Sequence, residues 1–213
     1  RMVSSDTVYS CFNEEPCFPG YLDDYALLGS VLIDYLSIEW NQNYYNTCMR
    51  VCDDLINNFE DKEKGGFFFT SDQHEQLFYR PKSISDDSVP SGLVYATDTL
   101  LYMGFISGNH KYIEAAHGAL DFIYKSIDDN LTSTVSAINL LREDNLEKEI
   151  IIVRTNEKAW EKITDSEEYY AKCIIFIENE LQNLPDYIAI KESKGEFTSC
   201  LLYTSPSPRD MPR

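Results

Sequence analysis

The sequence contains no long hydrophobic run. Its longest apolar stretches, such as residues 150–153 and 174–177, span only a few positions, whereas a helix needs about 20 apolar residues to cross a bilayer. The first residues also lack the basic, apolar and small-residue pattern of a signal peptide, and the chain does not begin with methionine. We therefore expect no membrane-spanning segment, no membrane partner, and a start that is internal to a longer protein.

Positive charge is scarce. There are 18 Lys and Arg residues against 36 Asp and Glu residues, which gives a formal net charge of -18 and an isoelectric point near 4.4. An acidic surface of this kind repels phosphate backbones. The composition therefore predicts no nucleic-acid partner and favours neutral or cationic ligands, while the same charge also keeps a protein soluble.

The cysteines lack the spacing of a metal or redox site. Cys11, Cys17, Cys48, Cys52 and Cys173 are mostly far apart, and none belongs to a Cys-x-x-Cys motif. This pattern argues against a disulfide framework, a zinc site and a thioredoxin-type redox centre, and indicates reduced thiols in a cytoplasmic protein. Cys48 and Cys52 are four positions apart on a predicted helix, so they could either pack in the core or bind a metal. Because no histidine is nearby, we predict no metal and no cofactor.

The end of the chain differs in character from the rest. The peptide CLLYTSPSPRD at 200–210 corresponds to one reading frame of a transposase adapter used in sequencing libraries. We interpret residues 200–213 as a non-native tail and leave them out of the fold prediction.

The composition, 43% hydrophobic and 13% aromatic, suffices for a sizeable buried core.

Apolar spacing predicts two helical hairpins. Residues 21–40 and 45–59 carry apolar side chains at helical spacing on either side of an Asn-rich break. Residues 91–107 and 111–127 repeat the plan about 67 to 70 positions later, with Ser91 as the expected N-cap and Gly108 at the break. Short breaks imply antiparallel pairs.

The region between the hairpins carries many aromatic residues. Gly65 and Gly66 indicate a turn, and residues 67–70 and 77–80 form either two short strands or an aromatic loop. A long loop of this composition favours a binding site, where the rings could stack on a sugar or form a buried cluster. His74 and Glu75 are a possible acid–base couple, although a lone histidine is usually a surface residue.

The later part of the chain is predicted to be α/β. β-Branched runs at 149–153, 172–177 and 187–190 indicate strands, and an acidic stretch at 157–162 indicates a helix. We therefore expect a mainly α fold, with helical hairpins in residues 1–145 and a small α/β segment in residues 146–199.

Two polar signatures precede the predicted helices. FPGYLDDYA at 18–26 places Asp23 and Asp24 in a first helical turn, where carboxylates complement the helix dipole. RPKSISDDSVPSG at 80–92 offers Arg80 for a carboxylate or phosphate and Asp86 for hydroxyl groups. The alternative for this second signature is internal ion pairing, in which Arg80 and Lys82 pair with Asp86 and Asp87 across their own loop.

The two signatures and GGFFFT at 65–70, in this order and spacing, resemble the helical-barrel part of thioredoxin-domain-containing proteins of the spermatogenesis-associated and YyaL type. The resemblance covers roughly residues 7–199 and departs from the family at Leu93, where a small polar residue such as Asn is usual. It implies a thioredoxin-like domain ahead of a barrel similar to six-hairpin glycosidases. This chain would then form a partial (α/α)6 toroid, and the absent thioredoxin-like domain would be its partner.

The resemblance leaves two function classes open. The first is a binding or accessory module, which we favour because no paired-histidine pattern of sugar epimerases is present. The second is a carbohydrate-active enzyme for a sugar-like substrate, with Asp23 and Asp24 as catalytic acid and base. Its substrate-binding residues would be Tyr25, Arg80, Lys82, Asp86 and Ser91. An enzyme would require Asp24, Tyr25, Arg80 and Asp86 to meet at one concavity. Separately, because a partial toroid leaves apolar helix faces uncovered, we expect the chain to aggregate when it is expressed alone.

Overall fold

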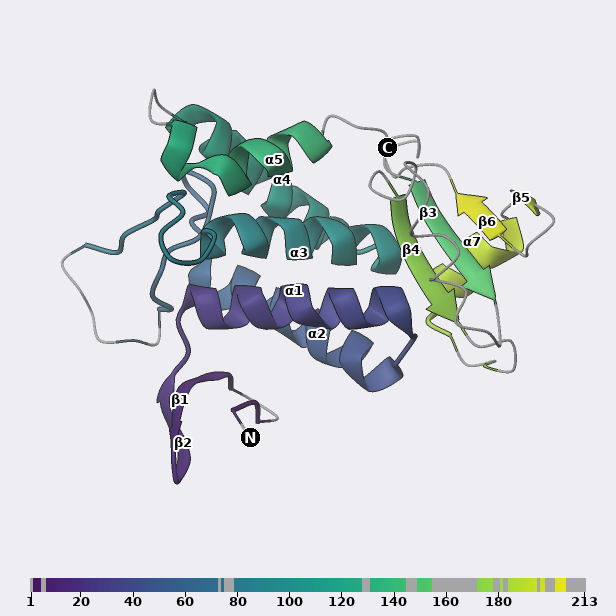
Figure 1. The fold of residues 1–213 in the computed structure, drawn as a ribbon, viewed down its shortest axis with the longest axis horizontal. Helices are drawn as coiled ribbons and strands as arrows, with labels where there is room; N and C mark the ends of the chain where they lie inside the picture. The colour runs from purple at the N-terminus through teal and green to yellow at the C-terminus, as the bar shows by residue number, and fades with distance from the viewer. Residues whose placement is uncertain are drawn as a thin grey trace.

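The computed structural model describes the chain in segments. They are residues 2–4, 7–72, 74, 79–127, 131–144, 149–154, 172–177, 181, 184–194, 196–197 and 202–205. Across these segments the fold is mainly helical, as predicted, with small sheets near both ends (Figure 1). None of the described helices is long and apolar enough to cross a membrane.

The first predicted hairpin consists of α1 (Leu22–Ile38) and α2 (Gln42–Asp54), which continues as a π-helical turn at Leu55–Phe59. The spacing of α1 buries one stripe, made of Leu22, Tyr25, Ala26, Gly29, Leu32 and Leu36. Asn41 begins α2, because its side-chain oxygen accepts hydrogen bonds from the N–H groups of Asn43 and Tyr44. These bonds satisfy donors that a helix start leaves unpaired.

The second hairpin consists of α3 (Gly92–Ser107) and α4 (His110–Ser126). Gly108 ends α3 in the left-handed conformation, with a φ of 70°, which glycine adopts without strain. The Asn109 side chain then accepts from the Lys111 N–H at 3.1 Å and begins α4. The predicted break at Gly108 is confirmed.

α3 is the central helix of the fold. It packs against α1 on one side and α4 on the other, and most of its side chains are buried (Figure 1). The two hairpins approach closely at Gly29, where an added Cβ would lie 2.6 Å from Thr99 Cγ2. Fully burying a large side chain such as Leu100 or Met103 of α3 contributes about 1.5–3 kcal/mol, so this helix supplies much of the core.

Ser91 stands at the N-cap position of α3, but the prediction that it caps the helix is wrong. Its side chain accepts no hydrogen bond from the first turn. The Ser91 hydroxyl instead donates to the Ser83 carbonyl oxygen at 2.9 Å. The Asp86 carboxylate holds the residue at the N-cap position, since it accepts from the Ser91 N–H at 3.0 Å.

The segment between the hairpins is a loop, not a pair of strands, in its described residues. Phe67 joins Glu60 through an isolated antiparallel bridge only. Gly65 and Gly66 turn the chain with φ values of 73° and 77°, as the Gly-Gly signal predicts. Phe67 is fully buried, so part of the aromatic run belongs to the core. Residues 75–78 lie outside the described residues.

Two of the predicted C-terminal strands are confirmed. β3 (Glu149–Arg154) and β4 (Lys172–Ile177) pair in parallel, in a sheet of order β4-β3-β6-β5 that includes β5 (Glu196–Phe197) and β6 (Leu202–Ser205). β6 lies within the segment we interpret as non-native, and its composition is β-prone whatever its origin. The sheet lies at one end of the helical hairpins, where β4 packs against α1 (Figure 1).

The strand predicted at 187–190 is wrong. These residues belong to α7 (Asp186–Lys194), in which the Ala189 N–H donates to the Pro185 carbonyl at 3.0 Å. A proline before the first turn (Pro185) and an acidic residue within it (Asp186) favour a helix start. Here they outweigh the strand preference of the two isoleucines. The helix predicted at 157–162 lies outside the described residues.

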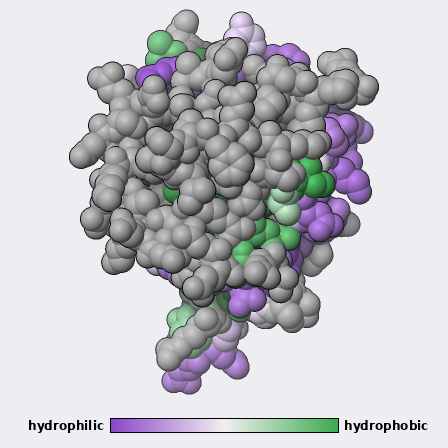
Figure 2. Space-filling view, turned by 90° about the vertical axis from the view of Figure 1, so that its right-hand side faces the viewer, coloured by the Kyte–Doolittle hydropathy of each residue, from purple (hydrophilic) through white to green (hydrophobic). Residues whose placement is uncertain are grey.

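Sequence analysis missed α5 (Val135–Asp144) and an N-terminal hairpin of β1 (Tyr9–Asn13) and β2 (Glu15–Pro19). The hairpin projects from the helices beside the start of α1 (Figure 1). Figure 2 shows the same projection below the body of the molecule, with hydrophilic residues at its tip. The turn is tight because Glu14 adopts a φ of 63° between the paired residues Asn13 and Glu15.

Candidate functional site

The two polar signatures meet where α1 and α3 begin. Asp23, in the first turn of α1, lies so close to Gly92 that an added Cβ there would be 2.0 Å from Asp23 Oδ1. Any other residue at position 92 would collide with the carboxyl group. The glycine of the second signature therefore makes room for the aspartate of the first.

The pKa of Asp23 is raised, first by burial and then by the negative charges of Asp24 and Asp87. No hydrogen bond joins its half-buried carboxyl group to another residue in the described part of the chain. A carboxyl group in this environment keeps its proton to higher pH, as a general acid requires.

Asp24 has a structural role. Its Oδ2 atom accepts a hydrogen bond from the Tyr21 N–H at 2.9 Å, which ties the carboxylate to the residue before α1. This is the reciprocal half of a capping box, in which a side chain three residues into the helix satisfies the backbone of its first residue. The interpretation of Asp24 as a helix-start carboxylate is therefore the one the geometry supports.

Tyr25 is a core residue. Its ring lies 5.2 Å from that of Phe59, and its hydroxyl oxygen accepts from the Val8 N–H at 3.4 Å. Burial raises the pKa of Tyr25, and the bond from Val8 partly offsets the shift. The side chain thus anchors the segment before β1 to α1.

Asp86 joins the starts of two helices. Besides the Ser91 N–H, its carboxylate accepts from the Ser136 N–H at 2.9 Å and from the Ser136 hydroxyl. Burial alone would raise the pKa of Asp86, but the hydrogen bonds from Ser136 and Ser91 lower it overall. Its polar atoms therefore connect α3 to α5.

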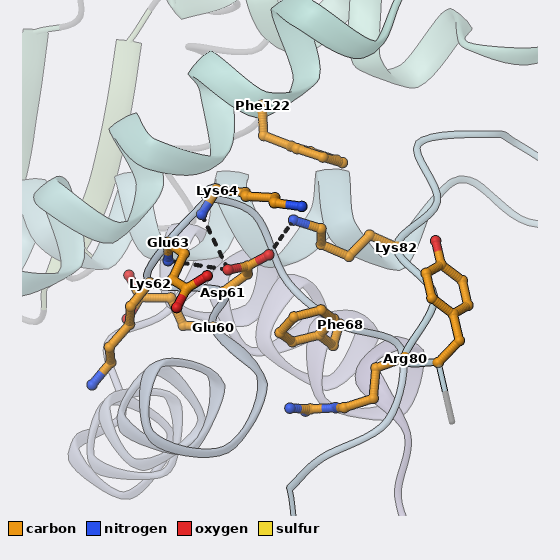
Figure 3. A pocket seen from close by; sticks show the side chains of 10 residues that line it. Glu60, Asp61, Lys62, Glu63, Lys64, Phe68, Arg80, Lys82 and Phe122 are labelled. Carbon is orange, nitrogen blue, oxygen red and sulfur yellow. Dashed lines mark hydrogen bonds and ion pairs between the residues drawn. The ribbon is translucent and has the colours of Figure 1, made fainter. Parts of the chain in front are cut away.

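Arg80 and Lys82 line a pocket of about 850 Å³ between the loop after α2, the second signature and α4 (Figure 3). The other lining residues are Glu60, Asp61, Lys62, Glu63, Lys64, Phe68, Tyr79 and Phe122. Two residues predicted as substrate-binding are thus brought together. Asp24, Tyr25 and Asp86 do not line this pocket, so it does not gather the four residues that the enzyme interpretation requires at one concavity.

Lys82 forms an ion pair with Asp61. Its Nζ atom lies 2.6 Å from Asp61 Oδ2 and 2.8 Å from the Gly65 carbonyl oxygen, and 4.1 Å from the centre of the Phe122 ring. The Asp61 carboxylate also accepts from the N–H groups of Glu63 and Lys64 (Figure 3). Burial would raise the pKa of Asp61, yet Lys82 and these two N–H groups lower it overall.

Arg80 is held by backbone carbonyl groups. Its Nε atom donates to the Thr70 oxygen at 3.1 Å, and Nη2 donates to the oxygens of Asn58 and Thr70. The guanidinium carbon lies 4.2 Å from the centre of the Phe68 ring, within cation–π range. The predicted pairing of Arg80 and Lys82 with Asp86 and Asp87 is therefore wrong, because both cations find their partners outside this loop.

His74 packs against the first signature. Its ring stacks on Tyr21 at 4.9 Å, Nδ1 lies 2.7 Å from Ser71 Oγ, and Nε2 lies 3.3 Å from the Pro19 carbonyl. Because that carbonyl accepts only, Nε2 donates to it, and in the neutral ring Nδ1 then accepts from the serine hydroxyl. His74 thus links the aromatic loop to α1, and its proposed acid–base partner Glu75 lies outside the described residues.

Sequence reasoning missed Asp61, Phe122 and Tyr21 as site residues. Asp61 follows the π-helical turn and gives no local motif, while Phe122 appears only as one apolar position of α4. In the described ranges no group of three or more His, Cys, Asp or Glu side chains is placed to hold a metal ion.

Comparison with known proteins adds no assignment. No protein-family model matches the chain, and no curated protein matches it significantly.

Proposed function

We propose that the chain is a binding or accessory module, not a catalyst, and that its pocket at Lys82 takes a sugar-like small molecule. On this proposal it belongs to a cytoplasmic thioredoxin-domain-containing protein of the spermatogenesis-associated and YyaL type. The absent thioredoxin-like domain is then a partner, and the hairpins are part of an (α/α)6 toroid.

The proposal rests on the hydrogen bonds that the predicted catalytic and binding groups form. Asp24 holds the start of α1, Asp86 holds the starts of α3 and α5, and the Ser91 hydroxyl donates to a backbone carbonyl. A general acid or base needs a proton-transfer atom that faces the substrate. These groups instead satisfy backbone atoms, which favours a structural role for the signatures.

The pocket offers both aromatic rings and carboxylates to a ligand. Tyr79 is 75% exposed at its edge and Phe122 lies on α4, so aromatic rings are available to pack against the apolar face of a sugar ring. The carboxylates of Glu60 and Glu63 line the same pocket and are acceptors for hydroxyl groups. Its volume of about 850 Å³ falls within the usual range for small-molecule sites.

The test is equilibrium binding of a panel of monosaccharides, measured by titration calorimetry on the wild-type chain and on Tyr79→Ala. The variant should weaken binding by about two- to tenfold, since an aromatic contact contributes about 0.5–1.5 kcal/mol. Tyr124→Ala is the matched control, because Tyr124 is 74% exposed on α4 but does not line the pocket. Absence of binding to any sugar, or an equal loss in both variants, would refute the proposal.

A carbohydrate-active enzyme is the second candidate, and the raised pKa of Asp23 is the observation that favours it. Glycoside hydrolysis uses one carboxyl group that stays protonated and a second that stays ionised. Asp87 of the second signature is close enough to act on the Asp23 charge and would supply the second group.

Turnover of aryl glycosides by Asp23→Asn distinguishes the two candidates. Asp54→Asn is the control, because Asp54 is also half-buried and its pKa is likewise raised by burial. Activity in the wild-type chain that is lost in Asp23→Asn and kept in Asp54→Asn would support the enzyme. No activity in any of the three supports the binding module.

A further inference from the structure

Two cysteines face each other across the N-terminal hairpin. Cys11 of β1 and Cys17 of β2 are partners in the antiparallel register, and their Sγ atoms lie 3.0 Å apart. Both side chains are half-buried, and both thiols are free. Their separation in sequence hides this relationship, because only a tight turn at Glu14 brings positions 11 and 17 opposite one another.

The geometry is that of a dithiol ready to close. A disulfide holds its sulfur atoms about 2.05 Å apart, roughly 1 Å closer than these two thiols. Residues directly opposite in an antiparallel pair have Cβ atoms about 4.5–5.5 Å apart, near the separation that a disulfide spans. Small side-chain rotations therefore suffice to form the bond, and the strands need not unpair.

The hairpin is also attached to the body of the protein. The Gly20 N–H donates to the Val8 carbonyl at 2.8 Å, and the Val8 N–H donates to the Tyr25 hydroxyl. A bond between Cys11 and Cys17 would therefore close a short ring next to the start of α1. The hairpin tip, with Asn13, Glu14 and Glu15 exposed, stands clear of the helices (Figure 1).

Cys48 and Cys52 of α2 behave differently. Cys48 and Cys52 are fully buried, and burial raises the pKa of Cys52 well above its usual value. The Cys48 thiol donates to the Gly29 carbonyl at 3.8 Å within the contact between α1 and α2. A dissolved oxidant cannot reach these sulfur atoms without unfolding, so they form an internal reference for accessibility.

We propose that Cys11 and Cys17 form a thiol–disulfide exchange site that passes two electrons to a disulfide-bearing oxidant and closes into an intramolecular disulfide. One thiolate attacks a sulfur of the oxidant, whose other sulfur leaves as a thiol. The second cysteine then attacks the protein sulfur of the mixed disulfide and releases the remaining thiol. In balance, two protein thiols lose two protons and two electrons, and the oxidant disulfide becomes two thiols.

The pKa of Cys11 fits the role of a paired thiol. It is raised, first by the hydrogen bond with Cys17 and then by burial, so Cys11 holds its proton near neutral pH. A thiolate is the reactive form in exchange. The reaction is therefore expected to be faster in mildly alkaline buffer than at neutral pH.

The test uses the full chain, oxidised glutathione as the probe, and peptide mapping by mass spectrometry after free thiols are alkylated. A glutamate-specific protease cuts after Glu14, whereas Pro16 blocks cleavage after Glu15, so Cys11 and Cys17 leave on separate peptides unless a disulfide joins them. We expect the joined pair to accumulate, while Cys48 and Cys52 become alkylated only after denaturation.

Cys11→Ser completes the design. In this variant Cys17 should retain glutathione about tenfold more than in the wild-type chain, because no neighbouring thiol at high effective concentration resolves the adduct. Stable glutathione adducts on wild-type Cys11 or Cys17 without a bridge would overturn the proposal. So would a bridge from either cysteine to Cys48 or Cys52, or two thiols that stay reduced in excess oxidant.

Discussion

Lys82 and Asp61, 21 positions apart in sequence, form an ion pair of 2.6 Å between the second signature and the loop after α2. Each side chain is only 10% exposed, and the carboxylate is further held by the N–H groups of Glu63 and Lys64. The pair fixes one wall of the pocket. It also shows that the charges of the signature are satisfied by distant parts of the chain.

Replacing one partner of this pair should destabilise the fold. Asp61→Asn leaves a nearly buried ammonium group without its counter-ion, and we expect a loss of about 3 kcal/mol in the free energy of unfolding, measured by urea denaturation. Asp72→Asn is the control, since Asp72 is exposed, and should change stability by less than about 0.5 kcal/mol. Equal effects of the two substitutions would contradict this role for Asp61.

The same pair predicts a pH dependence. The pKa of Asp61 is lower in the folded chain than its ordinary value, because Lys82 and two N–H groups outweigh the effect of burial. Its stabilising contribution is therefore complete above the unfolded pKa of about 3.9 and is lost as pH falls through the lower folded pKa. The difference in Tm between the wild-type chain and Asp61→Asn should be constant near neutral pH and shrink below about pH 4.

The contact between Asp23 and Gly92 predicts a steric effect. Gly92→Ala places a Cβ 2.0 Å from Asp23 Oδ1, so we expect destabilisation of about 1–3 kcal/mol by thermal unfolding. Gly118→Ala is the matched control on α4, where the nearest atom to a new Cβ is 3.9 Å away, and should stabilise by about 0.5–1 kcal/mol. Adding Asp23→Ala to Gly92→Ala should restore most of the loss; a double variant no better than Gly92→Ala would exclude this contact as the cause.

Replacing Asp86 should lower the stability of the fold more than replacing Asp87. Asp86→Ala removes an acceptor shared by the Ser91 N–H, the Ser136 N–H and the Ser136 hydroxyl, and we expect a loss of about 1–3 kcal/mol. Asp87→Ala, at an exposed position, should have little effect. Amide hydrogen exchange should be faster at the starts of α3 and α5 in the Asp86 variant only; unchanged exchange there would count against this role.

The outer face of α1 exposes apolar side chains that could make the chain aggregate. Val31, Tyr35 and Ile38 are exposed at helical spacing, and the Tyr35 ring packs beside Tyr44 of α2 at 5.6 Å. Exposed apolar patches promote association, so light scattering should reveal aggregates that Val31→Lys and Ile38→Lys reduce. A monomer with a sharp cooperative melt at the same concentration would show the prediction to be wrong.

Local signals in the sequence predicted the helical core well. The α1 stripe follows from side-chain spacing, and the break at Gly108 follows from the left-handed conformation that glycine permits. Weak or conflicting signals failed. The isoleucines at 188 and 190 suggested a strand, whereas Pro185 and Asp186 begin α7, and the N-terminal hairpin depends on a positive φ at Glu14 that no residue type announces.

The site was harder to predict because its partners are distant in sequence. Arg80 and Lys82 were identified as pocket residues, but Asp61 and the backbone carbonyls that hold them were not. Asp23 and Asp24 look equivalent in the sequence, yet only Asp23 lies against α3, while Asp24 bonds to Tyr21. Tertiary packing, not composition, separates their roles.

We propose that the polar signatures build the junction between the hairpins and that ligand binding belongs to the neighbouring pocket. The most direct measurement is the change in backbone amide chemical shifts as a monosaccharide is titrated into the chain. We expect shifts at residues 60–68, 79–82 and Phe122, with Asp23 and Asp24 unchanged and no turnover of the sugar. Shifts centred on Asp23 and residues 86–92, or conversion of the sugar to product, would contradict it.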